Sequence, residues 1–283
     1  MEHPKRTLSH IRSALYGEPW MIEESGLEKL IAIAESHAAG VLPEAALKFA
    51  NNEKDDGILE MDGRVAIVSI NGPVFPKANM MTALSGATSS QAISDAMDEV
   101  IKMRPDHMIL RVDSPGGAVM GGFEAADKIM QVKQAGIPVT ASVEGMAASL
   151  AYLFASQADQ IFLSRVSVLG SISVIFKAQN DDRMYRNAGV DMVTLRSGDR
   201  KQVENVIAGG NSTTGQMRGL VSRIDALHGM FVDAINRGRF GSKGINGAAL
   251  ANGDIWIGAE AVKAGLADGI ETFEQTRERV KNS

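Results

Sequence analysis

Between residues 64 and 196, short β-branched runs alternate with segments of helical periodicity, and this alternation constrains the fold more than any other feature. Strands are predicted at Arg64–Ile70, His107–Val112, Pro138–Val143, Asp159–Leu163 and Met192–Arg196. Helices are predicted between them, at Gln91–Met103, Gly121–Ala135, Gly145–Gln157 and Phe176–Ala188. Strands that alternate with single helices imply right-handed crossovers and a buried, largely parallel sheet. We therefore expect an α/β fold with a mainly parallel sheet flanked by helices.

The segment before this alternating region has a different texture. Residues 1–24 are predicted to form an irregular arm with the aromatic anchors Tyr16 and Trp20. Two short amphipathic helices are expected next, at Leu27–Ala39 and Pro43–Asn51, because their apolar residues recur at helical spacing. The polar stretch that follows them, residues 51–57, is typical of a linker. The chain is accordingly divided into an N-terminal arm, residues 1–56, and a main domain, residues 57–283.

The C-terminal part is predicted to be helical. The expected helices lie at Thr213–Arg237, Ala259–Ala264 and Phe273–Lys281. The longest mainly apolar stretch of the chain, Met146–Ala155, is about half of the roughly 20 residues that a membrane-spanning helix needs. The charged N-terminus also lacks the apolar core of a secretory signal. We expect a protein without a membrane span that stays in the cytoplasm.

Composition excludes several classes of function. The chain has no cysteine, so disulfide scaffolds, thiol nucleophiles and cysteine-ligated metals are absent. Its five histidines do not form a pair at metal-binding spacing. The net charge of −5 argues against a dedicated nucleic-acid binder, which usually has a basic excess.

The first candidate site is the stretch RVDSPGGAVMGG at Arg111–Gly122, where a strand runs through Pro-Gly-Gly into a helix. Gly116 and Gly117 permit positive φ and leave backbone N–H groups uncovered. Such groups at a helix entrance suit an anion or an oxyanion. A tight turn between strand and helix is the alternative interpretation. A dinucleotide-binding loop is disfavoured because the glycines lack the G-x-G spacing.

The second candidate site is SVEGMAASLAYLFAS, in which Ser149 follows a strand, a glycine and small residues at the head of an apolar helix. A helix N-terminus favours developing negative charge, so Ser149 is a candidate nucleophile; the alternative is a serine that merely packs in an alanine-rich helix. A serine nucleophile needs a base, and no histidine is well placed to serve. A lysine whose pKa is lowered can replace it, and the candidates are Lys177 and Lys201. Lys201 follows a predicted strand, although most loop lysines are simply solvated.

Four motifs in order, SPGG before a helix, GMAAS, VLGSISV and SGDRK, resemble the serine–lysine peptidases of the signal peptide peptidase A family. The resemblance extends from about Val65 to Ile270 and includes the C-terminal pattern IWIGAEAVKAGLADGI. That family belongs to the Clp/crotonase superfamily. The resemblance therefore implies a Clp/crotonase-like fold built from repeated ββα and βα units, with a mainly parallel sheet and a helical C-terminal part.

The same resemblance assigns roles to individual residues. Ser149 matches the nucleophile and Lys201 the general base. Ser171 matches the hydroxyl that orients the lysine ammonium, and Gly116, with Gly117 beside it, matches the backbone donor to the oxyanion. One departure concerns residue 173, where the family commonly has glycine and this chain has serine, which adds bulk and restricts φ.

The N-terminal stretch HIRSALYGEPWMIEESGLEKLIAIA resembles the leader of phage head-assembly proteases of the minor capsid protein C type. The serine–lysine resemblance implies a serine endopeptidase that works through an acyl-enzyme and needs neither a metal nor an organic cofactor. The leader resemblance adds that it processes phage or prophage scaffold, portal or capsid proteins during head assembly. Its location is then the host cytoplasm or the procapsid. The expected partners are a polypeptide substrate and further copies of the chain in a homo-oligomer, with no nucleic acid.

Three alternatives remain open on the sequence. One is a bacterial cytoplasmic peptidase that degrades signal peptides or proteins. Another is a crotonase-like acyl-CoA enzyme, which would use carboxylates, and Glu144 is the only acid close to the GMAAS turn. The third is a capsid scaffold or decoration protein without enzymatic activity, which would have no reason to bring Ser149, Ser171 and Lys201 together.

Overall fold

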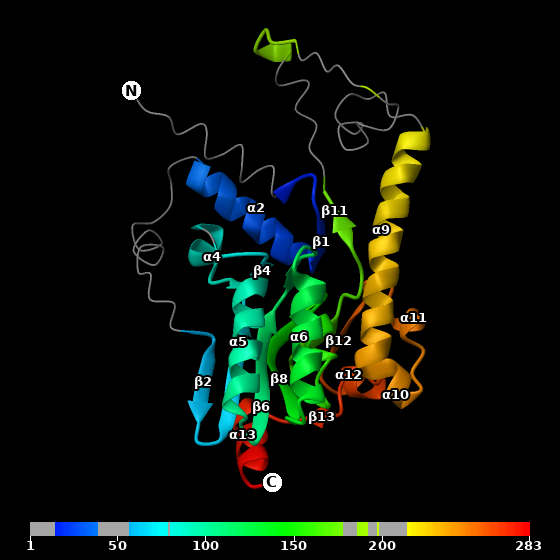
Figure 1. The fold of residues 1–283 in the computed structure, drawn as a ribbon. Helices are drawn as coiled ribbons and strands as arrows, with labels where there is room; N and C mark the ends of the chain where they lie inside the picture. Colours follow the sequence, from blue (N-terminus) through cyan, green and yellow to red (C-terminus); the bar gives the residue numbers. More distant parts are fainter. Residues whose placement is uncertain (1–14, 39–56, 79, 178–185, 192–196, 198–213) are drawn as a thin grey trace, which may run out of the picture.

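The computed structural model describes residues 15–38, 57–78, 80–177, 186–191, 197 and 214–283 of the chain (Figure 1). The strands are β1 (Pro19–Ile22), β2 (Leu59–Asp62), β3 (Val65–Asn71), β4 (Val74–Phe75), β5 (Thr88–Ser89), β6 (His107–Ser114), β7 (Gly116–Ala118), β8 (Val139–Ala148), β9 (Gln160–Leu163), β10 (Val168–Gly170), β11 (Ile175–Phe176), β12 (Ile255–Ile257) and β13 (Gly269–Ile270). The helices are α2 (Glu24–Ala38), α4 (Met80–Ser85), α5 (Ser90–Met103), α6 (Gly122–Gln134), α7 (Leu150–Ala155), α9 (Thr214–Ile235), α10 (Gly241–Lys243), α11 (Gly247–Leu250), α12 (Ala259–Lys263) and α13 (Phe273–Lys281). A π-helical turn, Asn236–Phe240, continues α9.

The larger sheet has the strand order β12-β10-β8-β6-β3-β2, and β9 also pairs with β8. The central strands β3, β6 and β8 run parallel, with Ile67 opposite Ile109 and Ile109 opposite Thr140. β9 and β10 are also parallel to β8, whereas β2 and β12 pair antiparallel at the edges. β-Branched side chains suit this buried, pleated surface. The predicted α/β class is confirmed.

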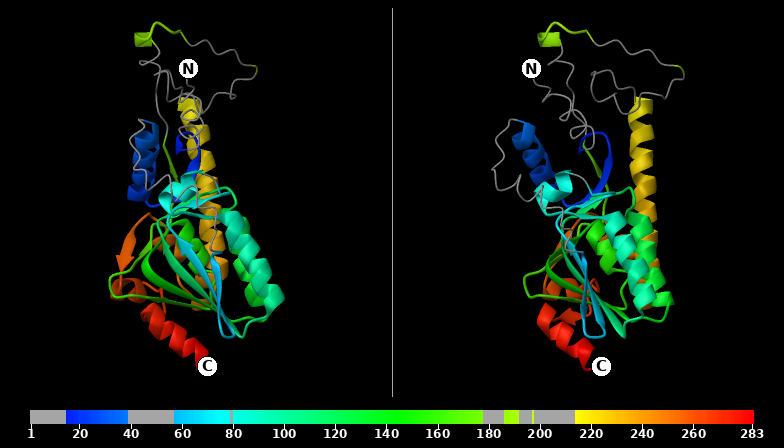
Figure 2. Two further views of the ribbon diagram at one scale, coloured as in Figure 1. Left: turned by 90° about the vertical axis from the view of Figure 1, so that its left-hand side faces the viewer. Right: turned by 60° about the vertical axis from the view of Figure 1, so that its left-hand side comes forward.

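Different helices cover the two faces of the larger sheet, because successive residues of a strand point to opposite faces. Ala66 and Val68 of β3 join the main core, which includes the buried sides of α5 and α6. Ile67, between them, packs instead in a small cluster with Phe273 and Val280 of α13. Figure 2 shows α13 on the side of the sheet away from α5 and α6.

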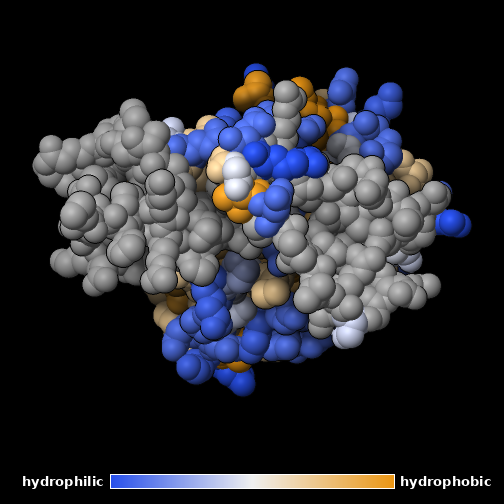
Figure 3. Space-filling model, turned by 90° about the horizontal axis from the view of Figure 1, so that it is seen from above, coloured by the Kyte–Doolittle hydropathy of each residue, from blue (hydrophilic) through white to orange (hydrophobic). Residues whose placement is uncertain are grey.

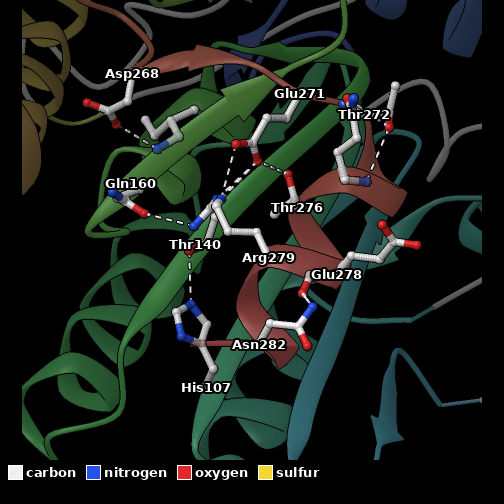
Figure 4. Close-up of polar contacts among 12 residues, drawn as sticks. His107, Thr140, Gln160, Asp268, Glu271, Thr272, Thr276, Glu278, Arg279 and Asn282 are labelled. Carbon is white, nitrogen blue, oxygen red and sulfur yellow. Dashed lines mark hydrogen bonds and ion pairs between the residues drawn. The ribbon is translucent and has the colours of Figure 1, made fainter.

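Polar contacts hold α13 at the lower end of the sheet (Figure 4). The Arg279 guanidinium donates to the Glu271 carboxylate at 3.1 Å and to Gln160 Oε1 at 3.3 Å. Nearby, the His107 ring lies 2.9 Å from Thr140 Oγ1, and burial lowers the pKa of this histidine. His107 begins β6, so this cluster lies at the end of the sheet opposite to the carboxyl ends of the parallel strands.

A second, smaller sheet has the order β11-β1-β7-β4-β5. β7 continues the chain directly from the carboxyl end of β6, so this sheet lies at that end of the larger one (Figure 1). β4 is parallel to both of its neighbours, β5 and β7. β1, in contrast, is antiparallel to both β7 and β11.

The N-terminal segment differs from the irregular arm expected for residues 1–24. Pro19–Ile22 forms a strand, because β7 and β11 supply hydrogen-bonding partners that the local sequence does not reveal. The helix expected at Leu27–Ala39 is present as α2 but begins at Glu24. The helix expected at Pro43–Asn51 lies outside the described residues. The division of the chain at residue 57 stays a prediction.

Two predicted boundaries near the serine motif are wrong. The helix expected from Gly145 is strand as far as Ala148, since β10 pairs with this stretch in parallel register and keeps it extended. Phe176, expected to open a helix, ends β11 and is paired with Pro19. The strand predicted at Met192–Arg196 lies outside the described residues.

The predicted helical character of the C-terminal part is confirmed by α9, α12 and α13. The capping box at Thr272 and Gln275 explains why α13 begins at Phe273. In the described part of the chain, no helix combines the length and the apolarity that a membrane crossing requires.

Candidate functional site

Ser149 stands at the junction between β8 and α7. Its backbone has φ 54° and ψ −118°, a region that residues with a side chain rarely occupy. Its N–H donates to the Gly170 carbonyl at 2.7 Å, and its own carbonyl accepts from Leu153 N at 3.0 Å. The side chain is fully buried. Such strained residues, held in place by their surroundings, concentrate at functional sites.

Ser171 lies beside Ser149 at the end of the neighbouring strand. β8 and β10 are parallel with Ala148 opposite Gly170, so each serine directly follows one member of this pair. Ser171 also has a positive φ, 51°, and its N–H donates to the Asp254 carbonyl at 2.6 Å. Two hydroxyl-bearing residues therefore meet at the carboxyl ends of adjacent parallel strands.

Gly116 and Gly117 lie at the start of β7, against the same point of the fold. Gly116 has φ 102°, and a Cβ on it would collide with the Met21 carbonyl and lie 2.9 Å from the Ala148 carbonyl. A Cβ on Gly117 would collide with the Val74 carbonyl. Only glycine fits this close approach of backbones. Gly116 is thereby placed against the residue that precedes Ser149.

Two polar partners at the site were not assigned from the sequence. The Ser149 hydroxyl donates to the carbonyl oxygen of Ser173, 3.3 Å from Ser149 Oγ. From the sequence, Ser173 was notable only because the family commonly has glycine at this position. The Gly116 N–H donates to Ser114 Oγ at 3.2 Å. A serine two residues before the glycine is the signal for this local bond, because serine hydroxyls commonly bind nearby backbone groups in turns.

The structure describes only one of the two candidate lysines, Lys177. Lys201 lies outside the described residues. The Lys177 ammonium lies 3.2 Å from a Glu24 carboxylate oxygen and 3.5 Å from one of Glu28. Partial burial would lower the pKa of Lys177, but these two carboxylates outweigh it and raise that pKa above its ordinary value. Lys177 is therefore held as a cation and is a poor candidate for a general base.

A cleft of about 480 Å³ opens between α2 and the turns next to the site. Its walls include Gly26 and Lys29 of α2, and Pro115 and Met146 beside the glycine and serine motifs. Within the described ranges, no group of three or more histidine, aspartate or glutamate side chains could hold a metal ion. The described part of the site thus offers the hydroxyls of Ser149 and Ser171 and the backbone amide of Gly116. Such groups suit attack on a carbonyl and stabilisation of the resulting oxyanion.

Comparison with known protein families identifies one match. The sequence pattern of Peptidase family S49 matches residues 131–283, more than half of the chain, and this range contains both Ser149 and Ser171. The family resemblance inferred from the four motifs is confirmed by this match.

Among individual proteins, the chain is 28% identical to the probable protease SohB of Haemophilus influenzae over 190 residues, 66% of this chain and 52% of that protein. It is 25% identical to the head-tail preconnector protein GP5 of Enterobacteria phage P21 over 281 residues, 93% of this chain and 55% of that protein. It is 27% identical to the capsid assembly protease C of Escherichia phage lambda over 290 residues, 93% of this chain and 63% of that protein. The chain thus spans from about half to slightly less than two thirds of the length of these relatives.

Proposed function

Because the chain belongs to peptidase family S49, we propose that it is a serine endopeptidase that cleaves polypeptides through an acyl-enzyme on Ser149. The observation that carries this proposal is the meeting of Ser149, Ser171 and Gly116 at the carboxyl ends of β8, β10 and β6. Three residues from separate motifs, each matched to a role, come together there although they are far apart in the sequence.

In the proposed mechanism, neutral Lys201 accepts the hydroxyl proton of Ser149 while Oγ attacks the scissile carbonyl carbon. The Gly116 N–H stabilises the oxyanion, an effect typically worth about 3 kcal/mol per donor. To do so, it exchanges Ser114 Oγ for the substrate oxygen. Lys201 then protonates the leaving amine as the C–N bond breaks. Finally water, deprotonated by Lys201, attacks the acyl-enzyme and releases the acid, and Ser149 regains its proton; Ser171 orients the lysine throughout.

We assign the fold to the Clp/crotonase-like type. Two consecutive units of the ββα kind support this assignment: β3 and β4 lead through α4 and β5 to α5, and β6 and β7 lead directly to α6. The first strand of each unit and β8 form the parallel centre of the larger sheet, while β4 and β7 pair in the smaller one.

For the biological substrate, we propose phage scaffold, portal or capsid proteins, processed in the host cytoplasm or the procapsid. The names of two relatives, a capsid assembly protease and a head-tail preconnector protein, support this, and both match over nearly the whole chain. A bacterial protein-degrading peptidase is the second candidate, favoured by the similarity to SohB.

The acyl-CoA alternative depends on Glu144, and the contacts of this residue argue against it. Its carboxylate is ion-paired with Arg111, whose guanidinium carbon lies 4.4 Å from the centre of the Phe273 ring. The Glu144 carboxylate is thus held by an arginine that packs on α13. Hydrolysis of a peptide, with no turnover of an acyl-CoA thioester, separates the two functions.

Labelling with a fluorophosphonate, followed by mass spectrometry of the modified peptide, tests the proposal. We expect covalent modification at Ser149 and none in the Ser149→Ala variant. Ser142→Ala is the matched control, because Ser142 is an equally buried serine of β8, the strand that leads to Ser149, and this variant should label normally. A folded wild-type protein that neither labels nor cleaves an unfolded polypeptide would instead support the non-enzymatic capsid protein.

A further inference from the structure

β1 lies inside the smaller sheet, between the glycine strand β7 and β11, and Figure 1 shows it beside β11. On one side Met21 is opposite Gly117 and Ile22 is opposite Gly116; on the other side Trp20 is opposite Ile175. Both backbone edges of this four-residue strand are therefore paired. A segment from the N-terminal part of the chain fills the space between the two strands that border the proposed active site.

The backbone of β1 reaches the surroundings of the nucleophile. A Cβ added to Gly116 would collide with the Met21 carbonyl and lie 3.1 Å from Ile22 Cα, and it would also lie 2.9 Å from the Ala148 carbonyl. Because Ala148 precedes Ser149, β1 meets the proposed oxyanion donor and the nucleophile strand at one point. Ser149 is fully buried and its hydroxyl donates to the Ser173 carbonyl, so a substrate carbonyl or a serine-directed probe reaches this hydroxyl only when the site opens.

Three of the four side chains of β1 are as deeply buried as core residues. Met21 is fully buried in the main core, whereas Trp20 and Ile22, on the opposite face of the strand, pack in a second cluster with Leu27 and Leu30 of α2. The described surface visible at this end of the molecule is hydrophilic with interspersed apolar residues (Figure 3). The apolar side chains of β1 are themselves buried, as those of a bound apolar peptide would be.

Addition of an extended strand to an open sheet edge is a general way of binding a peptide. Without β1, the strands β7 and β11 would present two facing edges beside Ser149. We propose that β1 is an autoinhibitory strand that occupies the place of the substrate and must leave before a polypeptide can bind, an inference that rests on the proposed peptidase function. The entering strand runs antiparallel to β7 and places an apolar side chain where Met21 now lies.

Contacts on the β11 side act as a latch for this strand. The Gly17 N–H donates to the Lys177 carbonyl at 2.9 Å, which extends the pairing beyond β1. The Lys177 ammonium is ion-paired with Glu24 and Glu28 of α2. These pairs are partly exposed to solvent, so they can open without breaking the core. Trp20 Nε1 is buried with no hydrogen-bond partner among the described residues, which leaves β1 incompletely satisfied in its closed position.

A reversible cross-link between β1 and β11 tests the proposal. The chain has no cysteine, so one engineered pair forms a disulfide without competing thiols. Pro19 and Phe176 are opposite each other in the register, and residues so placed in antiparallel strands have Cα separations that a disulfide can bridge. We expect oxidised Pro19→Cys/Phe176→Cys to hydrolyse fluorescein-labelled casein about tenfold more slowly or worse, with recovery on reduction, since the open state is no longer populated.

The two single-cysteine variants are the controls, and their rates should not respond to reductant. A fully oxidised double variant, verified by mass spectrometry, that cleaves casein as fast as its reduced form would overturn the proposal. Binding gives a readout without catalysis. In a Ser149→Ala background, reduced protein should bind labelled casein in fluorescence anisotropy and oxidised protein should not; equal binding contradicts autoinhibition. If no form cleaves casein but binding still follows the redox state, the peptidase proposal fails and the strand exchange stands.

A second set of variants keeps the proposal testable if the cysteine pair disturbs folding. Glu24→Gln/Glu28→Gln removes both carboxylates of the latch and should raise the casein-cleavage rate several-fold. Glu35→Gln, on the same helix, is the matched control and should leave the rate unchanged. A double variant that folds normally and cleaves casein no faster than wild type would contradict the proposal that these ion pairs hold β1 in its inhibitory position.

Discussion

Ser149 and Ser171 follow the two members of one register pair in adjacent parallel strands, and both have a left-handed φ, 54° and 51°. The bond from Ser149 N to the Gly170 carbonyl ties the two turns together. Neither serine gains from this backbone conformation itself, which costs a residue with a Cβ on the order of 1–3 kcal/mol. Such conformations persist only where the surrounding structure holds them, as the bond between the two turns does here.

Ser149→Ala should abolish peptide hydrolysis, by about a thousandfold or more, because the nucleophile is lost. Ser149→Gly should be equally inactive but more stable than Ser149→Ala by about 1 kcal/mol, since glycine adopts this backbone conformation without strain. Casein cleavage and urea unfolding of the two variants measure these effects. Equal stability of the two variants would mean that residue 149 is not strained.

Lys201 should act only when neutral, so kcat/KM should rise with pH as this lysine loses its proton. Lys201→Ala should be inactive across about pH 6 to 10, the span in which a shifted lysine titrates. Ser171→Ala should lower the rate less than Lys201→Ala does, because Ser171 orients the base without taking the proton. A Lys201→Ala variant with the pH–rate profile of the wild type rules out the assignment.

Gly116→Ala should reduce both stability and activity, because the new methyl group collides with the Met21 carbonyl and crowds the Ala148 carbonyl. Gly136→Ala is the matched control. Gly136 also has a positive φ, 84°, but a Cβ there meets nothing within 4 Å. It should lose only about 1 kcal/mol of stability through backbone strain and keep full activity. Thermal unfolding and casein cleavage compare the two, and identical effects would refute the steric argument.

Arg239 and Asp268 form a buried ion pair, with 3.0 Å between Arg239 Nη1 and a carboxylate oxygen. Burial would raise the pKa of Asp268, but hydrogen bonds from Arg239 and Lys243 outweigh it and hold that pKa below its usual range. Arg239→Met, which leaves the carboxylate poorly compensated, should therefore cost about 3 kcal/mol at pH 7. Arg64→Met is the control; it breaks an exposed pair with Asp106 and should change little.

The same pair predicts a pH dependence of stability. Because the folded-state pKa of Asp268 is lowered, its contribution is present above the unfolded-state pKa, near 4, and is lost as the pH falls through the lower folded-state value. The difference in unfolding free energy between wild type and Asp268→Asn should thus be constant near neutrality and shrink in acid. Urea unfolding at several pH values measures it, and a difference that grows in acid contradicts this sign.

We further predict a homo-oligomer with sites shared between subunits. Inactive Ser149→Ala and inactive Lys201→Ala, when co-expressed, should then regain part of the activity, because some interfaces pair an intact serine with an intact lysine. Sites built within one chain would each lack one group. A mixture without activity, in which native mass spectrometry detects mixed oligomers, excludes shared sites.

The sequence alone predicted what depends on local patterns. The β-branched run at β3 and the helical period of α5, α6 and α13 are encoded within a few neighbouring residues, so those elements lie close to their predicted bounds. The motif order likewise predicted the family, which the match to Peptidase family S49 confirms. The proposed roles of Ser149, Ser171 and Gly116 came from the same motifs, and Lys201 remains a sequence-based assignment.

The tertiary structure decided what depends on partners far away in the chain. Pro19–Ile22 has no strong local preference that sets it apart from an irregular arm, and it is a strand because β7 and β11 complete its backbone hydrogen bonds. The extension of β8 to Ala148 depends in the same way on β10. Periodicity reports which face of an element is buried, but not which strand lies beside it. The pairing of β1 with the glycine strand was therefore invisible in the sequence, because hydrogen bonds between strands are made by backbone groups that every residue shares.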